Sequence, residues 1–390
     1  MSYSKGIRIP GIYSGKEAFI ARSKERKQQR KTKTLTLESL ISAYKTMDHD
    51  RDFAPNTFFL NKVLFKRALR QIRSGNYTPK RPKNLTISKP SGGFRELNIP
   101  YWVDRVVAKA VLTELTSVVD PKFDHRSHGG RPNMGTESAI AMAYKAIAAG
   151  MNYVIACDVK DAFPNTPTES AICILEKLAG AHSCMELAKV CIRGHKGHKR
   201  VLGLDQGNPL SPIAFNAYMH EWVDLIVPNE PEIQFIRYLD NIYLFSKDPD
   251  LIKDQALAVQ KLLAANGLIL KIDPIKDLCI EKIKILGYQI GIAENKIIMS
   301  SDESDMLHLA SLIEEAYEKP NPQLRAKLIV DSWLESKGLS DSWSLEHTLR
   351  VNQILNHYGI DLQIHHEDTQ TRFKDLKTNW AFKYQIPGQA

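Results

Sequence analysis

The spacing of apolar residues predicts helices over much of the chain and strands in its middle. Apolar residues recur at helical intervals within 36–47, 61–74, 101–119, 137–150, 211–227 and 251–266. A shorter and nearly continuous apolar run, Tyr153–Cys157, predicts a buried strand that ends at Asp158. From Ser301 onward the helical pattern returns. These elements predict an α+β protein with a separate helical C-terminal domain.

Two stretches have the pattern of β-hairpins. In NLTISKPSGGFRELNIP, residues 84–100, two strand-like runs flank a Gly-Gly pair. In RYLDNIYLF, residues 237–245, apolar and aromatic runs flank Asp240 and Asn241. Asp and Asn tolerate the left-handed backbone angles of a tight turn, so this pair favours a hairpin. The same turn would equally present a catalytic carboxylate, and the stretch alone does not separate the two interpretations.

The composition indicates a globular protein with a polyanionic partner. Hydrophobic residues make up 43% of the 390 residues, enough to bury a full core. The 53 Lys and Arg residues exceed the 44 Asp and Glu residues, and the net charge of +9 favours nucleic acid as the first candidate partner. The basic run Arg22–Lys33 is either a solvated arm or a nucleic-acid contact.

The cysteines and the apolar runs bear on the compartment. Five cysteines, an odd number scattered along a long chain, argue against a secreted disulfide scaffold and for a reducing compartment. No run of eighteen apolar residues occurs. We therefore expect a cytoplasmic protein without membrane contact.

Asp158 and Asp240 are the candidate catalytic carboxylates. One follows a buried strand and the other lies at a hairpin tip, so a single sheet could bring both to the same edge. Two hard divalent cations held by carboxylate oxygens can activate an attacking hydroxyl and stabilise the leaving oxygen in phosphoryl transfer. Mg²⁺ keeps several waters and binds substrate phosphates, so two protein carboxylates are sufficient in principle.

Two further loops carry candidate nucleotide contacts. Lys89 and Arg95 flank the Gly-Gly turn, where they are either solvated charges or cations that hold a triphosphate. Gln206 lies in LDQGNPLSP, which is either an exposed loop or a turn at which the backbone approaches a nucleotide closely.

Cys184, Cys191, His195 and His198 are residue types that bind zinc. Their spacing matches none of the usual zinc arrangements, and two cysteines seven residues apart fit a buried helix face. We therefore favour a structural role for them.

The order of these pieces resembles that of the reverse transcriptases. A Lys-x5-Arg pair is followed by DVKDAF, QGNPLSP, the hairpin YLDN and LGY, and FRELNIPYWVDRVV and SHGGRPNMGTESAIA also match stretches before the palm. The resemblance covers residues 84–291 and is strongest to the bacterial group that includes group II intron, retron and abortive-infection enzymes. It implies a right-hand polymerase with a basic N-terminal helical extension at 1–83, fingers at 84–150, a palm with an antiparallel sheet at 151–300 and a helical thumb-like domain at 301–390.

The resemblance implies a metal site at the end of the palm sheet. Asp158, the carbonyl of Val159 and Asp240 would bind Mg²⁺, with Mn²⁺ as an alternative. Asn241 stands where most relatives carry a second Asp, so the site has one formal negative charge fewer and should bind its metals more weakly. Asp205, in place of the more usual Pro before Gln-Gly, could supply a compensating charge.

Other residues would bind the substrate deoxynucleotide. The resemblance implies that Lys89 and Arg95 hold the triphosphate and that the backbone of Asp161 and Ala162 lines the sugar pocket. It also implies that Gln206 lies along the incoming nucleotide. Phe163 occupies the position of an aromatic gate that crowds a 2′-hydroxyl and so selects deoxynucleotides. An aromatic residue after a strand also fits the core.

Three further positions have counterparts in the family. Lys276 occupies the place of a lysine that can protonate departing pyrophosphate as a general acid. Pro274 and Asp277 depart from the usual local string, so a surface lysine is the alternative. The LGY turn at 286–288 matches the turn that grips the primer, and Arg131 matches a template-side loop residue.

These roles predict a nucleotidyltransferase that extends DNA along an RNA template. Two alternatives stay open: untemplated or protein-primed DNA synthesis at the same site, and a catalytically weak RNA-binding module in which Asn241 marks decay. The expected partners are template RNA and nascent DNA, with a structured non-coding RNA, a partner protein or a second copy of the chain as further candidates. The resemblance also favours a role in bacterial defence against phage.

Overall fold

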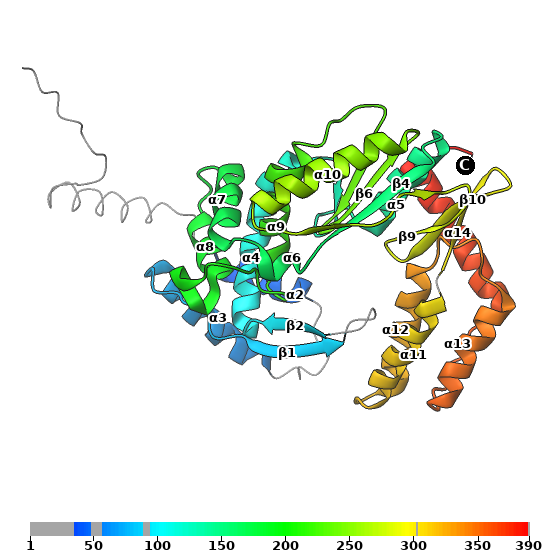
Figure 1. Ribbon diagram of the computed structural model, residues 1–390. Helices are drawn as coiled ribbons and strands as arrows, with labels where there is room; N and C mark the ends of the chain where they lie inside the picture. Colours follow the sequence, from blue (N-terminus) through cyan, green and yellow to red (C-terminus); the bar gives the residue numbers. More distant parts are fainter. Residues whose placement is uncertain (1–34, 48–56, 89–93, 302, 389–390) are drawn as a thin grey trace, which may run out of the picture.

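The computed structural model describes residues 35–47, 57–88, 94–301 and 303–388. N-terminal helices and a hairpin lie on one side of a central sheet, and a helical C-terminal region projects from the other (Figure 1). The basic run Arg22–Lys33 lies outside the described residues.

The N-terminal helices pack around one long helix. Helices α2 (Leu37–Thr46) and α3 (Thr57–Arg73) both contact α4 (Trp102–Val119). Strands β1 (Lys83–Ser88) and β2 (Phe94–Ile99) form the predicted antiparallel hairpin. Helix α4 buries the apolar stripe that the sequence predicts, namely Val103, Val107, Ala110, Val111 and Leu115.

The central sheet brings together strands from distant parts of the chain. In spatial order it consists of β3 (Ser127–His128), β5 (Gln234–Tyr238), β6 (Asn241–Ser246), β4 (Tyr153–Val159) and β7 (Leu270–Ile272), with β8 (Lys276–Asp277) also paired to β4. All pairings are antiparallel except that of β3 with β5. The predicted antiparallel sheet is therefore confirmed, and a short parallel edge strand is added to it.

Helices cover both faces of this sheet, which explains why β4 is nearly all apolar. Side chains alternate between the two faces of a strand. Ile155, Cys157 and Val159 belong to the larger core, and Val154 and Ala156 belong to the core on the other face. On the first face α10 (Pro249–Ala265) contacts β4 and β6, and α5 (Thr136–Ala148) contacts β5 and β6 on the second. Helices α7 (Thr168–Ala179), α8 (Met185–Arg193) and α9 (Ser211–Met219) contribute to the larger core.

Short helical segments connect these elements. They are η1 (Asp120–Lys122), α6 (Ala162–Asn165), η2 (Gly194–Lys199) and η3 (His220–Asp224). The helix predicted over 211–227 is divided, because the α-helical hydrogen bonds of α9 give way to the π-helical turn η3.

The C-terminal region has a helical core of its own and also packs against the central unit. Strands β9 (Ile283–Ile285), β10 (Tyr288–Ala293) and β11 (Lys296–Ser300) precede helices α11 (Glu303–Tyr317), α12 (Pro322–Ser336), α13 (Leu345–His357) and α14 (His366–Tyr384). These helices share an apolar core that includes Trp343 and Phe373. The end of α14 returns to the central unit, where the indole N–H of Trp380 donates to the carbonyl of Glu137 at 3.0 Å. The residues from Glu303 onward are thus mainly helical, and α14 contacts α5 (Figure 1), while the division into a separate domain stays a prediction.

Disulfides and membrane-spanning helices are the two features that the sequence argues against. All five cysteines are free thiols. In the described ranges, no helix has both the length and the apolar character that crossing a membrane requires.

Candidate active site

Asp158 and Asp240 lie side by side at one end of the central sheet. Strands β4 and β6 pair with Asp158 opposite Asn241, and the backbone N–H of Val159 donates to the carbonyl of Asp240 at 3.2 Å. Strands β5 and β6 pair up to Tyr238 opposite Asn241, so Asp240 sits in the tight turn between them. The stretch RYLDNIYLF is therefore a hairpin, and its turn places the Asp240 carboxylate beside Asp158, where a catalytic role stays a prediction.

The two carboxylates line a cavity of about 390 Å³. Its wall is formed by Arg95, Glu96, Asp158, Val159, Asp161, Ala162, Phe163, Pro164, Gln206 and Asp240. Eight of these are residues that the sequence singles out for metal or nucleotide binding, and only Glu96 and Pro164 are additions. Lys89 lies outside the described residues, so its predicted phosphate contact stays a prediction.

The chain reverses sharply after β4 to place Phe163. Asp161 has a left-handed backbone with φ of 45°, which ends the strand direction and starts the short helix α6. Within α6 the half-buried ring of Phe163 stacks on Phe215 of α9, with ring centroids 4.9 Å apart. The ring therefore belongs to the core on one side and to the cavity wall on the other. Gate and core interpretations of Phe163 are compatible with this position.

The electrostatics of the cavity fit a divalent cation. Burial raises the pKa of Asp240 above its ordinary value, the charge of Asp158 raises it further, and Arg95 acts in the opposite direction. Two carboxylates that repel each other in this way would be relieved by a cation between them. The Asn241 amide donates to Asp240 at 3.4 Å. Among the described residues, no group of three or more His, Cys, Asp or Glu side chains is placed to hold a metal ion, and metal binding by the two carboxylates and the Val159 carbonyl stays a prediction.

Gln206 lines the same cavity and carries an acceptor without a partner in the described part of the chain. Its side-chain oxygen is buried and has no hydrogen-bond partner within the described part of the chain. Its backbone carbonyl accepts from the N–H of Asn98 in β2 at 3.1 Å, which ties the loop to the hairpin that also carries Arg95. Gly207, where the loop passes Asn98 and Ile99 of the hairpin, has φ of 111°, a backbone conformation that favours glycine.

Asp205 does not add a free charge to the metal site. Its two carboxylate oxygens both accept from Nη2 of Arg200, at 2.7 and 2.8 Å, and one of them also accepts from the Asn98 amide at 3.2 Å. Asp205 and Arg200 are both buried. The suggestion that Asp205 compensates for Asn241 is therefore not supported, because a neighbouring guanidinium already balances its charge.

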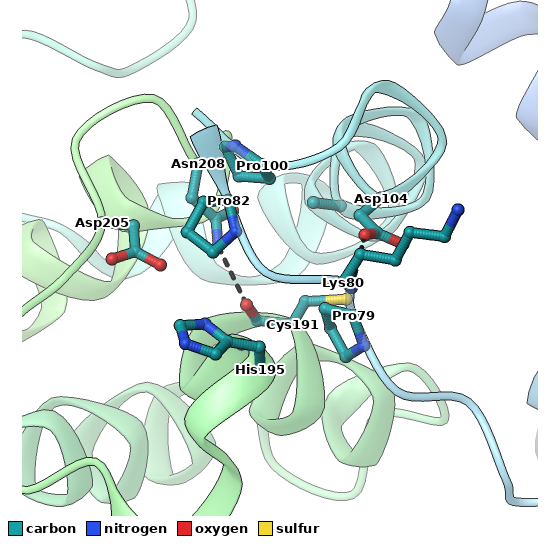
Figure 2. A pocket seen from close by; sticks show the side chains of 11 residues that line it. Pro79, Lys80, Pro82, Pro100, Asp104, Cys191, His195, Asp205 and Asn208 are labelled. Carbon is teal, nitrogen blue, oxygen red and sulfur yellow. Dashed lines mark hydrogen bonds between the residues drawn. The ribbon is translucent and has the colours of Figure 1, made fainter. Parts of the chain in front are cut away.

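A second, smaller cavity lies beside the Gln206 loop. It measures about 20 Å³, and Figure 2 shows Cys191, His195 and Asp205 on its wall. Cys184 and Cys191 are both buried along α8, as the helix-face interpretation predicts, and His198 is exposed. These positions favour packing over zinc coordination.

The structure does not bring Lys276 or Arg131 to the cavity. Lys276 pairs with Val154, four residues before Asp158, which corresponds to about 13 Å along a strand. Its ammonium group contacts Glu281 at 3.0 Å instead. Lys271, which sequence reasoning missed, is the lysine that stands opposite Asp158 in the β4–β7 register.

Arg131 is used inside its own loop. Its side chain is buried, pairs with Asp120 at 2.8 Å and donates to the carbonyls of Asp124 and Ser127 at 2.7 and 2.6 Å. Arg131 therefore stabilises its own loop, and its position does not support the predicted contact with the template.

The LGY turn at 286–288 forms a tight connection between β9 and β10. Leu286 and Gly287 both have positive φ, 47° and 94°, as a two-residue turn between paired strands requires. The backbone of Leu286 forms a hydrogen bond with the hydroxyl of Tyr243 in β6. The turn therefore lies against the strand that follows Asp240, where a primer-grip role stays a prediction.

Comparison with known proteins identifies the family of this domain. The family profile described as "Reverse transcriptase (RNA-dependent DNA polymerase)" matches residues 87–290, more than half of the chain. The chain belongs to the reverse transcriptase family. The match contains every residue of the larger cavity, and the predicted right-hand polymerase fold is thereby confirmed.

Individual relatives match this reverse transcriptase domain at low identity. Group II intron-encoded protein LtrA of Lactococcus lactis subsp. cremoris is 28% identical over 162 residues, which are 40% of this chain and 27% of that protein. The putative COX1/OXI3 intron 1 protein of Saccharomyces cerevisiae is 29% identical over 170 residues, 42% of this chain and 20% of that protein. The matched part of the chain thus spans only 20% to 27% of the length of these relatives.

A solved structure is also similar to this reverse transcriptase. Telomerase from Candida albicans, in complex with a TWJ fragment of telomeric RNA, has a TM-score of 0.42 and 11% identity to it. The similarity covers 80% of this chain and 64% of that one.

Proposed function

We propose that this chain is an RNA-directed DNA polymerase that adds deoxynucleotides by two-metal phosphoryl transfer. The observation that carries the proposal is the cavity in which Asp158 and Asp240 meet beside Phe163 and Gln206. Membership of the reverse transcriptase family supports it.

Asp158, Asp240 and the carbonyl of Val159 are the groups that would hold Mg²⁺, or Mn²⁺ in its place. When bound, two such cations activate the primer hydroxyl and stabilise the leaving oxygen of the nucleotide. The repulsion between the two carboxylates supports this assignment, because it makes the cavity attractive to positive charge. Carboxylate and carbonyl oxygens are also the donors that Mg²⁺ prefers.

The other cavity residues would bind and select the nucleotide. The Arg95 guanidinium would pair with phosphate oxygens of the triphosphate. The Phe163 ring, fixed from behind by Phe215, would leave no room for a 2′-hydroxyl. The unpartnered side-chain oxygen of Gln206 would accept a hydrogen bond from the nucleotide, which satisfies a buried acceptor.

Primer extension with defined nucleic acids tests the proposal. The purified protein is given a DNA primer on an RNA template, deoxynucleotides, and Mg²⁺ or Mn²⁺. Asp158→Ala and Asp240→Ala should each reduce extension by more than about a hundredfold, since loss of a group that merely supports a metal ligand already costs 10–100-fold. Asp254→Ala, an exposed acid on α10, is the matched control and should extend normally. Full extension by the double variant at 158 and 240 would contradict the proposal.

The same preparation separates the alternatives. Products made without template, or products covalently attached to the protein, would establish untemplated or protein-primed synthesis at this site. Tight RNA binding without any turnover in Mg²⁺ or Mn²⁺ would establish a binding module. Sequencing the nucleic acids that co-purify with the protein would identify the RNA partner.

We also propose a role in bacterial defence against phage, which would place the protein in the cytoplasm. This role rests on the resemblance to the bacterial group that includes retron and abortive-infection enzymes. Cells that express the protein should form fewer plaques on phage infection than cells that express Asp240→Ala. Equal plaque numbers across a broad phage panel would remove the role and leave the polymerase proposal untouched.

A further inference from the structure

The residue before Asp240 has a backbone conformation that its side chain disfavours. Leu239 has φ of 53°, in the left-handed region that favours glycine. Such a conformation persists only where the surrounding structure holds it, and it clusters at functional sites. Because Asp240 follows directly, any relaxation of Leu239 would move the carboxylate.

Three contacts hold Leu239 in place. Its backbone N–H donates to the carbonyl of His128 at 3.2 Å, and its carbonyl accepts from Nη1 of Arg237 at 3.0 Å. Its side chain lies against Gly129, where an added Cβ would come within 3.1 Å of the leucine Cγ and 3.0 Å of the Tyr238 ring. Contacts of the backbone N–H, the backbone carbonyl and the side chain of Leu239 therefore hold the turn in this conformation.

The guanidinium that donates to the Leu239 carbonyl belongs to Arg237, which is fully buried. All five guanidinium N–H groups have an acceptor. Nε and Nη2 donate to the two oxygens of Asp224 at 2.7 Å each, Nη2 also to Ser127 Oγ at 2.6 Å, and Nη1 to Asn216 at 2.9 Å and to the Leu239 carbonyl. A guanidinium with every donor occupied is fixed in orientation, so the Leu239 carbonyl is held by a rigid group.

Asp224 is the anionic partner of Arg237. It is fully buried in the π-helical turn η3. Burial alone would raise the pKa of Asp224, but the charge and hydrogen bonds of Arg237 hold that pKa below its ordinary value. Asn216 extends the network by donating to the carbonyl of Gly129 at 2.9 Å, so the loop against which Leu239 packs is tied to the same guanidinium.

We propose that Arg237 is a positioning residue that fixes the Asp240 carboxylate opposite Asp158 by holding the left-handed turn at Leu239. Neither Arg237 nor Asp224 lines the cavity, so the effect passes through the backbone of the turn. The inference rests on the proposed function, since it takes Asp240 to be a metal ligand. Metal affinity would then depend on a buried ion pair that touches neither metal nor substrate.

The test measures Mn²⁺ binding by electron paramagnetic resonance without nucleic acid, next to primer extension and thermal unfolding. Arg237→Lys keeps the charge but loses the fork that spans Asp224 and the Leu239 carbonyl. It should weaken Mn²⁺ binding by about tenfold, the effect of one lost hydrogen bond to a charged group, and lower kcat with little change in KM for primer-template. Glycine adopts positive φ without cost, so Leu239→Gly added to Arg237→Lys should restore much of the Mn²⁺ affinity.

Arg126→Lys is the matched control. Arg126 is also buried and donates to Asp124 and to carbonyls of the segment 224–228, but it makes no side-chain bond to the turn. It should lower the unfolding temperature without changing Mn²⁺ affinity. Leu239→Val leaves the ion pair intact and makes the left-handed backbone less favourable, so it should weaken Mn²⁺ binding even if Arg237→Lys folds poorly.

Two results would overturn the inference. One is wild-type Mn²⁺ affinity in both Arg237→Lys and Leu239→Val, which would leave the ion pair as a stabiliser of the fold alone. The other is a failure of Leu239→Gly to restore any affinity to Arg237→Lys. Failure of the proposed function looks different: the wild-type protein would not extend primers, while Asp240-dependent Mn²⁺ binding and its response to Arg237→Lys would remain.

Discussion

Asn241→Asp tests how the charge of the site sets its metal affinity. The Asn241 amide lies 3.4 Å from a carboxylate oxygen of Asp240, and Asn241 is the direct cross-strand partner of Asp158. Opposite residues of an antiparallel pair have Cβ atoms about 4.5–5.5 Å apart. The substitution therefore places a third carboxylate next to two that already repel each other.

The size of the effect follows from Coulomb's law. Two unit charges 4 Å apart interact by about 1 kcal/mol in bulk water and about 4 kcal/mol at an effective dielectric constant of 20. Asn241 is half-buried, so the added repulsion should fall between these values. A divalent cation gains attraction of the same order, and each 1.4 kcal/mol corresponds to about tenfold in affinity. The variant should thus be less stable without metal and should bind metal about tenfold more tightly.

Thermal unfolding and primer extension over a range of Mg²⁺ concentrations measure both effects. Without metal, the unfolding temperature of Asn241→Asp should be lower by several degrees, and half-maximal extension should need about tenfold less Mg²⁺. Asn241→Leu removes the amide without adding charge, so it should not tighten metal binding. An Asn241→Asp protein with the wild-type Mg²⁺ requirement and the wild-type metal-free unfolding temperature would show that the charge at position 241 does not set the metal affinity.

Three further predictions concern single side chains. Phe163→Val should admit a 2′-hydroxyl and reduce the preference for deoxynucleotides by tenfold or more in kcat/KM, and an unchanged ratio for dATP against ATP would exclude the gate. Burial, and to a smaller extent nearby guanidinium charges, lowers the pKa of His128 to about 4. Between pH 7 and pH 5 the His128 imidazole therefore takes up a proton only in the unfolded chain. The free energy of unfolding should fall by about 2 kcal/mol over this range. Urea unfolding at both pH values should show that loss in the wild type and not in His128→Gln. Lys276→Ala should extend primers at a rate within about twofold of the wild type, because the Lys276 ammonium pairs with Glu281 away from the cavity. A large fall in kcat would show that the Lys276 side chain moves to the cavity during catalysis.

Local patterns were sufficient to predict the elements that build the cavity. The apolar run before Asp158 and the alternating pattern around Asp240 each determine one strand end, and the register of β4 with β6 then brings the two together. Phe163, in the short helix α6, also stands close in sequence to the end of β4. In these cases the chemistry depends on residues close in sequence to a well-patterned element.

Partners distant in sequence could not be predicted from such patterns. Nothing local indicates that Asp205 pairs with Arg200, or that Arg237 reaches Asp224, Asn216 and Ser127. The identity of a buried partner depends on how helices and strands pack in three dimensions. Lys276 shows the same limit, since only the β4–β8 register reveals that it pairs four residues away from Asp158.

The strand order of the central sheet has a consequence for biosynthesis. Strand β4 lies between β6 and β7, and both of these neighbours follow it in the chain. Asp240 is 82 residues downstream of Asp158, so at 5–20 residues per second the ribosome needs several seconds to supply it. During that interval β4 is an apolar strand with two unpaired edges, a feature that promotes aggregation. The active site should therefore form only after β6 and β7 have been synthesised, and slower growth or added chaperone should raise the yield of folded protein.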